Sequence, residues 1–299
     1  MADADMTAAR LLAVPPLRAE YLRDIVANDD IGVVQKPLTV WQRLVNQAWL
    51  RKAFILLVIA AAWEAYARWL NNPLLVPTFT ATLEAFQAGI VSGDIPEKVS
   101  NSVQLLLKGY VLGLALAMCF TALAMMSRIG NDLLETLTSA FNPLPAIALL
   151  PLALIWFGLG DGSIMFVLVH SVLWAVALNT HSGFRSVSST LRMVGRNYGL
   201  KGPRFIVNIL IPAAFPSILT GLKIGWAFAW RTLIAAELVF GVSSGKGGLG
   251  WYIYENKNML DIPAVFAGLF TVILIGLIVE NLIFRNIEAV TVRRWGMQS

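Results

Sequence analysis

Long apolar segments alternate with polar ones along this chain. A helix needs about 17–25 mostly apolar residues to cross a hydrocarbon core about 30 Å thick. Six segments satisfy this requirement, and shorter stretches rich in charged residues, glycine or proline separate them. We predict membrane-spanning helices at residues 53–70, 103–126, 133–157, 163–178, 215–240 and 263–284. The pattern therefore predicts an all-α membrane protein with six transmembrane helices.

The composition agrees with a chain whose solvent is a bilayer. Of its 299 residues, 57% are apolar and 14% are charged, against about 45–50% and 25% in soluble domains. One cysteine, Cys119, and two histidines, His170 and His181, exclude a disulfide framework and argue against a zinc site, which takes three or four ligands. We therefore expect this chain to bind no metal and no cofactor of its own.

Lysine and arginine are distributed unevenly between the segments that separate the predicted spans. If the N-terminus is cytoplasmic, sixteen of them fall on the cytoplasmic side and only Lys98, Lys246 and Lys257 fall outside. Cytoplasmic loops of membrane proteins carry the excess of positive charge. We therefore expect both termini in the cytoplasm, with residues 291–299 as a cytoplasmic tail. The acidic opening of the chain is unlike a secretory signal, so no cleaved peptide is expected.

The first 52 residues are too polar to span a membrane. We expect residues 1–36 to form a mobile cytoplasmic tail and residues 37–52 to form an amphipathic helix. The apolar face of this helix repeats at helical spacing and consists of Trp41, Leu44, Val45, Ala48 and Trp49. Two interpretations stay open: the helix lies in the membrane interface, with its tryptophans at the headgroups, or it packs against protein.

Ionisable side chains inside the predicted spans bear on which classes of membrane protein fit the sequence. An intramembrane hydrolase needs paired acids, or a nucleophile and a base, at membrane depth. No two acidic residues share a predicted span, and His170 and Ser171 are consecutive, so they do not face each other on a helix. The sequence therefore predicts no catalytic residues.

Arg231 and Glu237 lie in the same predicted span. An ion-coupled secondary carrier would use them as an anion-binding cation and a coupling acid, and such a carrier is the alternative function. At about 1.5 Å per residue from Phe215, Arg231 lies about 24 Å along the helix and Glu237 about 33 Å. We therefore expect Glu237 to face the external mouth and Arg231 to be a buried charge, with a role in function or in a structural ion pair.

Glycines cluster between the fifth and sixth predicted spans. Residues 245–250 match the pattern G-x-G-x-x-G, and residues 241–246 resemble a phosphate-binding loop that is one residue short. Neither follows a strand in an α/β unit, as nucleotide-binding motifs require. Both also fall on the side predicted to be external. We interpret them as a flexible external turn and expect no nucleotide site.

Residues 181–212 form a long basic loop between the fourth and fifth predicted spans. Apolar residues recur at helical spacing in two stretches, 191–198 and 205–210. A short exposed helix on a polar loop is what a soluble partner would bind, although a basic loop can also serve only to fix topology.

This loop resembles the hallmark loop in the permease subunits of ATP-binding-cassette (ABC) importers. That loop reads Glu-Ala-Ala, three residues, Gly, nine residues, Ile, one residue, Leu-Pro. Gly199, Ile209 and Pro212 keep the spacing, whereas Met193 and Gly195 replace the Glu and the second Ala. The resemblance implies that a helix at 199–203 couples to a separate ATPase. The implied coupling residues are Met193, Arg196, Asn197, Tyr198, Gly199, Leu200, Lys201, Gly202, Pro203, Ile209 and Pro212.

Residues 54–290 also resemble, in order, the branch of that family that imports nitrate, bicarbonate, taurine and alkanesulfonates. The matching segments are 75–78, 143–161, 211–223 and 235–250. The resemblance implies the type I importer permease fold over residues 53–290, in the bacterial inner membrane. It also implies a homodimer with two ATPase subunits, which bind ATP and Mg²⁺, and a periplasmic or lipid-anchored solute-binding protein. No nucleic acid is expected as a partner, and the solute would be a small anion such as nitrate, a sulfonate, taurine, bicarbonate or an organic carboxylate.

Three prolines mark the third predicted span. Because they lack a backbone N–H, they break or bend a helix, and a membrane tolerates the freed carbonyls only against protein or water. A non-transporting scaffold would need neither a broken span nor a coupling loop. We expect the break to line a translocation pathway, whose candidate residues are Pro143, Pro145, Pro151, His170, Trp230, Arg231 and Glu237.

Overall fold

The computed structural model describes residues 46–240 and 247–296, which divide into a unit ending at Ile55 and a larger unit from Leu56 onward. The predicted tail at 1–36, most of the predicted amphipathic helix at 37–52 and the glycine segment 241–246 lie outside the described residues. Helix α3 (Ala48–Leu70) begins inside the predicted amphipathic helix. Residues 48–52 therefore belong to the helix of the first predicted span and not to a separate element.

Every regular element in the described ranges is a helix, which confirms the all-α class. Five helical segments are long and apolar enough to cross a membrane, and a bent pair of helices makes six if it counts as one span. Two of these segments are longer than a single α-helix. Short π-helical turns extend α11 (Ile211–Phe240) in one of them and α13 (Ile262–Ile278) in the other. The five segments are Ala48–Leu70, Asp94–Met126 (α5), Asp161–Ser186 (α8), Ile206–Val239 and Ile262–Arg293.

The third predicted span is not one continuous helix. Helix α6 (Arg128–Phe141) ends at a break, and the chain continues as a short 3-10 turn and α7 (Leu150–Phe157), bent by 88° from α6. Pro143 and Pro145 lie in the break, where their missing N–H groups interrupt the helical hydrogen bonds. Pro151 lies in the first turn of α7, where a helix needs no N–H from it. Two of the three prolines therefore break the span, and the third begins its second half.

Helix α8 is the most buried of the spans. It packs against both α5 and α11. In the apolar stretch of α8 56% of the residues are buried, whereas in that of α3 only 6% are buried. Glycines allow this close approach: a Cβ atom on Gly109 of α5 would lie 2.7 Å from Leu168, and one on Gly221 of α11 would lie 2.8 Å from Asn179. Membrane helices commonly use small residues to approach each other in this way.

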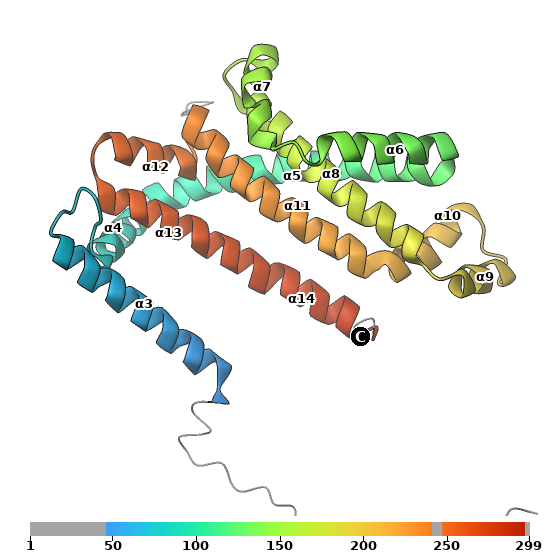
Figure 1. Ribbon diagram of the computed structural model, residues 1–299, viewed down its shortest axis with the longest axis horizontal. Helices are drawn as coiled ribbons and strands as arrows, with labels where there is room; N and C mark the ends of the chain where they lie inside the picture. The colour runs from blue at the N-terminus through green and yellow to red at the C-terminus, as the bar shows by residue number, and fades with distance from the viewer. Residues whose placement is uncertain (1–45, 241–246, 297–299) are drawn as a thin grey trace, which may run out of the picture. The chain divides into compact units, whose positions relative to one another are not determined.

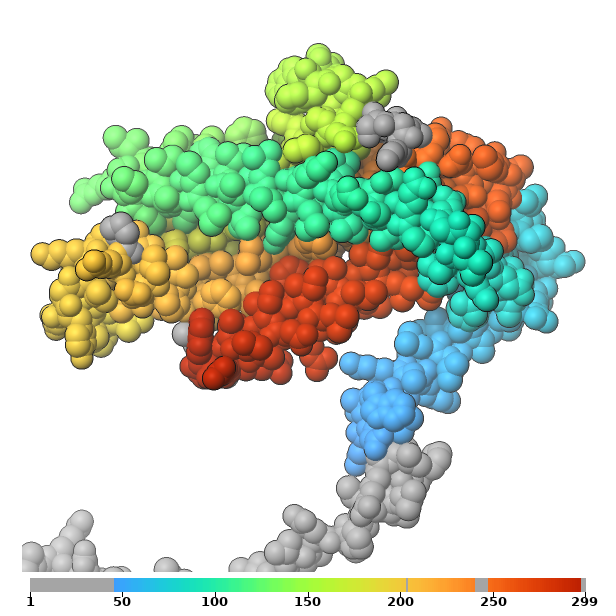
Figure 2. Space-filling model, turned by 180° about the vertical axis from the view of Figure 1, so that it is seen from behind, coloured from blue at the N-terminus to red at the C-terminus, as the bar shows by residue number. Residues whose placement is uncertain are grey.

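Short helices occupy two ends of the helix bundle (Figure 1). At one end lie α4 (Phe79–Val91) and α12 (Leu249–Asn258), both packed against α13. At the other end, α9 (Ser189–Asn197) and α10 (Gly202–Phe205) connect α8 to α11. Seen from behind, α5 and α6 form a continuous surface between the two ends (Figure 2). The predicted coupling loop and the start of α12 therefore lie at opposite ends of the bundle.

Candidate translocation and coupling sites

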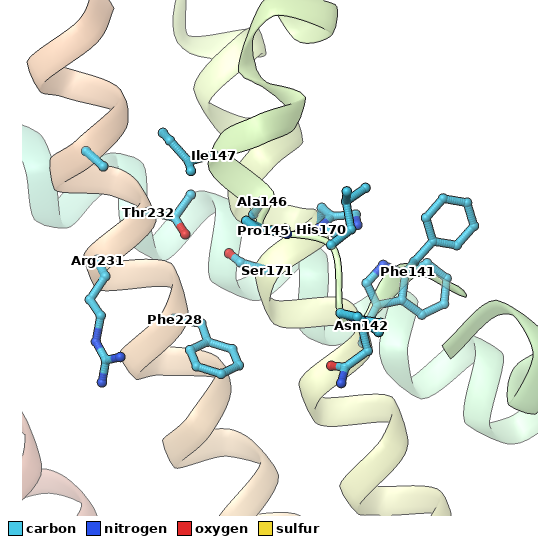
Figure 3. Close-up of a pocket in the computed structure, with 14 residues that line it drawn as sticks. Phe141, Asn142, Pro145, Ala146, Ile147, His170, Ser171, Phe228, Arg231 and Thr232 are labelled. Carbon is cyan, nitrogen blue, oxygen red and sulfur yellow. The ribbon is translucent and has the colours of Figure 1, made fainter. Parts of the chain in front are cut away.

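A cavity of about 350 Å³ lies at the break between α6 and α7. Its walls come from the break, from α8 and from α11, and Figure 3 shows Arg231 and Thr232 across from His170 and Phe141. The structure therefore brings three segments that are distant in the sequence around one largely apolar hollow, as in many ligand sites. The lining residues are Phe141, Asn142, Pro143, Leu144, Pro145, Ala146, Ile147, His170, Ser171, Trp174, Phe228, Arg231, Thr232 and Ala235.

The cavity contains part of the pathway predicted from the sequence. The predicted residues that line it are Pro143, Pro145, His170 and Arg231, and those that do not are Pro151, Trp230 and Glu237. Lining residues that were not predicted from the sequence include Phe141, Asn142, Trp174, Phe228 and Thr232. Helical spacing carried part of the missing signal, because Trp174 follows His170 by four residues and Phe228 precedes Arg231 by three.

Two expectations about α11 are wrong. Glu237, expected to face the outside, is only 3% exposed. Arg231, expected to be buried, is exposed in this chain and makes no ion pair with any described residue. Trp230 is buried and donates its ring N–H to the carbonyl of Val272 at 3.3 Å. Counting residues along a helix gives depth, whereas the face on which a side chain lies depends on the neighbouring helices.

Aromatic rings pack closely beside the cavity. Phe141 stacks on Trp174, with ring centroids 5.4 Å apart and planes inclined by 13°, and it meets His170 edge-on at 6.2 Å. Both ring nitrogens of His170 and the Nε1 of Trp174 are buried, and none has a hydrogen-bond partner in the described part of the chain. The wall of the cavity therefore contains three polar ring atoms without a partner.

Glu237 lies in a buried hydrogen-bond network that joins α5, α11 and α12. The Ser102 Oγ lies 2.8 and 2.9 Å from the two carboxylate oxygens, and the backbone N–H of Gly250 donates to Oε2 at 2.8 Å. The N–H of Leu249 donates to the Ser102 Oγ, also at 2.8 Å. Both N–H groups belong to the first turn of α12, where a helix offers no acceptors of its own. Glu237 and Ser102 therefore cap α12 from two other helices.

The glycines at the start of α12 have a packing role. A Cβ atom on Gly248 would lie 2.2 Å from Oε1 of Glu237, and one on Gly250 would lie 2.6 Å from the carbonyl of Ile234. Glycine has no Cβ, so these two positions leave room for the carboxylate to reach the first turn of the helix. Close contact with Glu237 thus explains glycine at positions 248 and 250.

The predicted coupling loop consists of a helix, a turn and a second short helix. The Ser188 Oγ caps α9 by accepting from the N–H of Leu191 at 3.3 Å. Gly199 has a φ of +73° and Gly202 a φ of +55°, a left-handed conformation that costs other residues about 1–2 kcal/mol. Gly199 and Gly202 therefore form the turn between α9 and α10. A helix over 199–203 was expected and is wrong, because α9 ends at Asn197 and α10 begins only at Gly202.

Gly195 allows α9 to pack against the rest of the loop. A Cβ atom at this position would lie 2.8 Å from Phe205 and 2.9 Å from Ile209, so Ile209 supports the loop from within. Pro212 is the second residue of α11 and directly follows the π-helical turn Ile206–Leu210, so the helix continues through it. The other predicted coupling positions include exposed basic and apolar side chains, and the exposed residues are Met193, Arg196, Asn197, Tyr198, Gly199, Lys201 and Gly202.

Comparison with known proteins agrees with this architecture. Residues 109–291 match the family described as binding-protein-dependent transport system inner membrane component. A protein of Methanocaldococcus jannaschii that bears the name of an ABC transporter permease is 32% identical over 73% of this chain and 82% of its own length. The taurine transport system permease protein of Escherichia coli is 27% identical over 79% and 86%, and the nitrate import permease protein of Synechocystis is 31% identical over 58% and 60%. This chain is thus a multi-pass inner-membrane protein that belongs to the family of permease subunits of binding-protein-dependent ABC importers.

Proposed function

We propose that this chain forms the translocation pathway of an ATP-driven importer for a small anion, and that the exposed turn at residues 196–202 couples it to a separate ATPase. The connection of that turn to the cavity carries the proposal. The loop continues directly into α8 on one side and into α11 on the other, and both helices line the cavity at the break. A displacement of the turn would therefore reach two walls of the cavity through rigid helices.

The proposed assembly is a homodimer of this chain with two ATPase subunits. ATP and Mg²⁺ bind to the ATPases, and this chain contributes no residue to hydrolysis. As the ATPases close on ATP, they move the turns at 196–202, and the spans open the pathway to the outside; hydrolysis resets them. The loop and both termini then lie in the cytoplasm, and a solute-binding protein docks at the end that carries α12. The excess of lysine and arginine in the loop and at the termini supports this orientation.

A small anion is the solute class that the cavity fits best. Arg231 is the basic residue of known positive charge among the described residues that line the cavity, and none of those residues is Asp or Glu. Two of the relatives bear names that assign them to taurine and nitrate transport. Both solutes carry a negatively charged oxygen group, which is the kind of group that a guanidinium binds well.

A secondary carrier that uses Arg231 and Glu237 together is not favoured. Glu237 is buried against Ser102 and Gly250, and it does not line the cavity that contains Arg231. A coupling acid has to exchange protons or cations with the pathway. The position of Glu237 suits a structural role at the start of α12.

Co-purification with the cognate ATPase tests the coupling proposal. The loop variants Tyr198→Ala and Lys201→Glu are compared with Lys257→Glu, an exposed position at the opposite end of the bundle. We expect the wild type and Lys257→Glu to form the complex, and the two loop variants to bind about tenfold more weakly, because each removes or reverses a contact in the turn. The proposal fails if the wild type forms no complex, or if the loop variants bind the ATPase as tightly as the wild type.

A further inference from the structure

Helices α8 and α9 meet at a two-residue connection. Helix α8 ends at Ser186 and α9 begins at Ser189. The connecting residues, Val187 and Ser188, have ψ angles of 123° and 145°, which lie outside the helical range. Hinges in proteins are a few residues of this kind, which absorb a change of backbone angle between two rigid elements. A force on α9 would therefore rotate it about Val187 and Ser188 and leave α8 in place, unless a further contact holds the two helices together.

Arg192 of α9 provides such a contact. Its Nη2 donates to the carbonyl of Phe184 at 2.5 Å, and its Nε donates to the carbonyl of Val187 at 3.2 Å. Phe184 belongs to the last turn of α8, where the carbonyl groups have no partner within the helix and the helix dipole favours a positive charge. The donors of a guanidinium lie in one plane with fixed directions. Arg192 therefore bridges the hinge and fixes the angle between α8 and α9.

The position of Arg192 differs from that of the other arginines and lysines between residues 181 and 212. Its side chain is half-buried, and the two residues that it bonds, Phe184 and Val187, are each 8% exposed and pack against Leu210. The other arginines and lysines of this range are exposed, namely Arg185, Arg196, Lys201 and Arg204. Water and salt screen a partly buried charge less than an exposed one. Arg192 therefore serves a contact inside the loop and not its outer surface.

The second half of α9 is fixed to the opposite side of the loop. A Cβ atom on Gly195 would lie 2.8 Å from Phe205 and 2.9 Å from Ile209, and these two residues belong to α10 and to the π-helical turn that leads into α11. Helix α9 therefore contacts the α11 side of the loop by packing and the α8 side through Arg192. Both α8 and α11 line the cavity at the break.

We propose that Arg192 is a positioning residue of the transport cycle, which makes α8 follow the turn at 196–202 when the ATPase moves it. The proposal rests on the proposed function and deepens it, because it names the residue through which the movement reaches one wall of the cavity. With the bridge in place, α9 and the last turn of α8 move as one body. Without the bridge, rotation at Val187 and Ser188 absorbs the movement, and the α8 wall stays behind.

Accessibility of the α8 wall to a thiol reagent tests this proposal without any solute. Ser171 lines the cavity from α8 (Figure 3), so the reporter chain carries Ser171→Cys, together with Cys119→Ser because Cys119 is the only cysteine of the sequence. The permease–ATPase complex is placed in proteoliposomes that enclose a non-hydrolysable ATP analogue and Mg²⁺, and a membrane-impermeant maleimide is added outside. The nucleotide should raise the alkylation rate of the reporter chain about threefold or more, and Arg192→Met should remove about half of this rise or more.

Three further variants separate transmission of movement from charge and from stability. Arg192→Lys keeps the charge without the planar fork, so its rise should lie between those of the reporter chain and Arg192→Met. Arg204→Met removes the same charge from an exposed position of the loop. Ser188→Ala removes the hydrogen bond that caps α9 and leaves Arg192 in place. Both of these controls should keep the full rise. Assembly with the ATPase and the melting midpoint are recorded for every variant.

The results distinguish this proposal from the proposed function. The role of Arg192 is overturned if Arg192→Met assembles with the ATPase and keeps the full rise, or if Ser188→Ala loses as much of the rise as Arg192→Met does. If Arg192→Met does not assemble, Arg192→Lys decides by the same comparison. A reporter chain that binds no ATPase, or whose alkylation rate does not respond to the nucleotide, overturns the proposed function itself.

Discussion

Ser102 of α5 and Glu237 of α11 are 135 positions apart in the sequence, yet the Ser102 Oγ lies 2.8 Å from a carboxylate oxygen of Glu237 in the buried interior. The same Oγ accepts from the N–H of Leu249, and Gly250 donates to the carboxylate. A carboxylate at a helix N-terminus is also favoured by the helix dipole. Three helices are therefore joined at one buried point, at the end of the bundle opposite the coupling loop.

Loss of the Ser102 hydroxyl should destabilise this junction. Ser102→Ala leaves the N–H of Leu249 and one acceptor position of Glu237 buried without a partner, which costs about 1–3 kcal/mol. The midpoint of thermal unfolding in detergent should fall by several degrees. Ser100→Ala is the matched control, because Ser100 is exposed on the same helix and its Oγ accepts a hydrogen bond from the side chain of Gln104. Equal midpoints for the two variants would contradict the assigned role of Ser102.

Gly248→Ala should damage the same junction by a different route. Its Cβ would lie 2.2 Å from Oε1 of Glu237 and 2.3 Å from the Ser102 Oγ, so the carboxylate must move away from α12. We expect a loss of about 1–3 kcal/mol in the free energy of unfolding. Gly160→Ala serves as the control, because nothing lies within 4 Å of a Cβ there and its backbone is extended. A melting midpoint for Gly248→Ala equal to that of Gly160→Ala would refute the steric argument.

The sequence predicted the membrane segments well because hydropathy depends on composition alone. It could not predict where the helices end in polar surroundings: α5 begins at Asp94, nine residues before the predicted span, and α8 continues to Ser186, past the predicted limit at 178. Polar residues at these ends prolong the helices beyond the apolar window. The prolines located the break at Pro143 and Pro145, but the bend of 88° follows from packing that no local signal contains.

The side chains of the sites were less predictable than the spans. Arg231 and Glu237 are six residues apart on α11. Arg231 was predicted to be buried and Glu237 to be exposed, and the structure shows the reverse, because the burial of each side chain depends on which helix faces it. Glu237 meets α5 and α12, whereas Arg231 lies at the edge of the cavity with its side chain exposed. Gly199 was identified from its spacing and does adopt a left-handed conformation. The contact of Gly195 with Phe205 and Ile209 required the folded loop.

Gly199→Ala tests whether the shape of the coupling turn matters for the ATPase. No atom lies within 4 Å of the added Cβ, and only the φ of +73° opposes it. The strain of about 1–2 kcal/mol therefore acts on the turn and not on packing. We expect ATPase binding to weaken about threefold to tenfold while the melting midpoint of the transmembrane bundle changes little. Gly199→Asn should bind the ATPase more tightly than Gly199→Ala, since asparagine tolerates this conformation better. Tighter binding by Gly199→Ala than by Gly199→Asn would contradict this explanation.

Tyr252 predicts a loss of stability at alkaline pH. Burial of its side chain and, to a smaller extent, the carboxylates of Asp94 and Asp261 raise the pKa of Tyr252 to about 12. An unfolded tyrosine ionises near pH 10. Below about pH 10 both states keep the proton and this residue contributes no pH dependence; between about pH 10 and 12 only the unfolded state loses it, so the free energy of unfolding falls as pH rises.

The variant Tyr252→Phe should remove this share of the alkaline loss, measured as the melting midpoint between pH 9 and about pH 12. Tyr254→Phe is the control on the same helix, because the side chain of Tyr254 is exposed. If the wild type and Tyr252→Phe lose stability in parallel across this range, the assignment to Tyr252 is wrong.

Reconstitution into proteoliposomes tests the central claim most directly. The permease, its cognate ATPase and the solute-binding protein are combined, and uptake of radiolabelled ethanesulfonate is followed with and without ATP on the ATPase side. If this chain is the pathway of an ATP-driven importer, uptake requires hydrolysable ATP, persists when proton and sodium gradients are collapsed, and is reduced by Lys201→Glu. Uptake that proceeds without ATP and follows an ion gradient would show that the chain is not part of an ATP-driven importer.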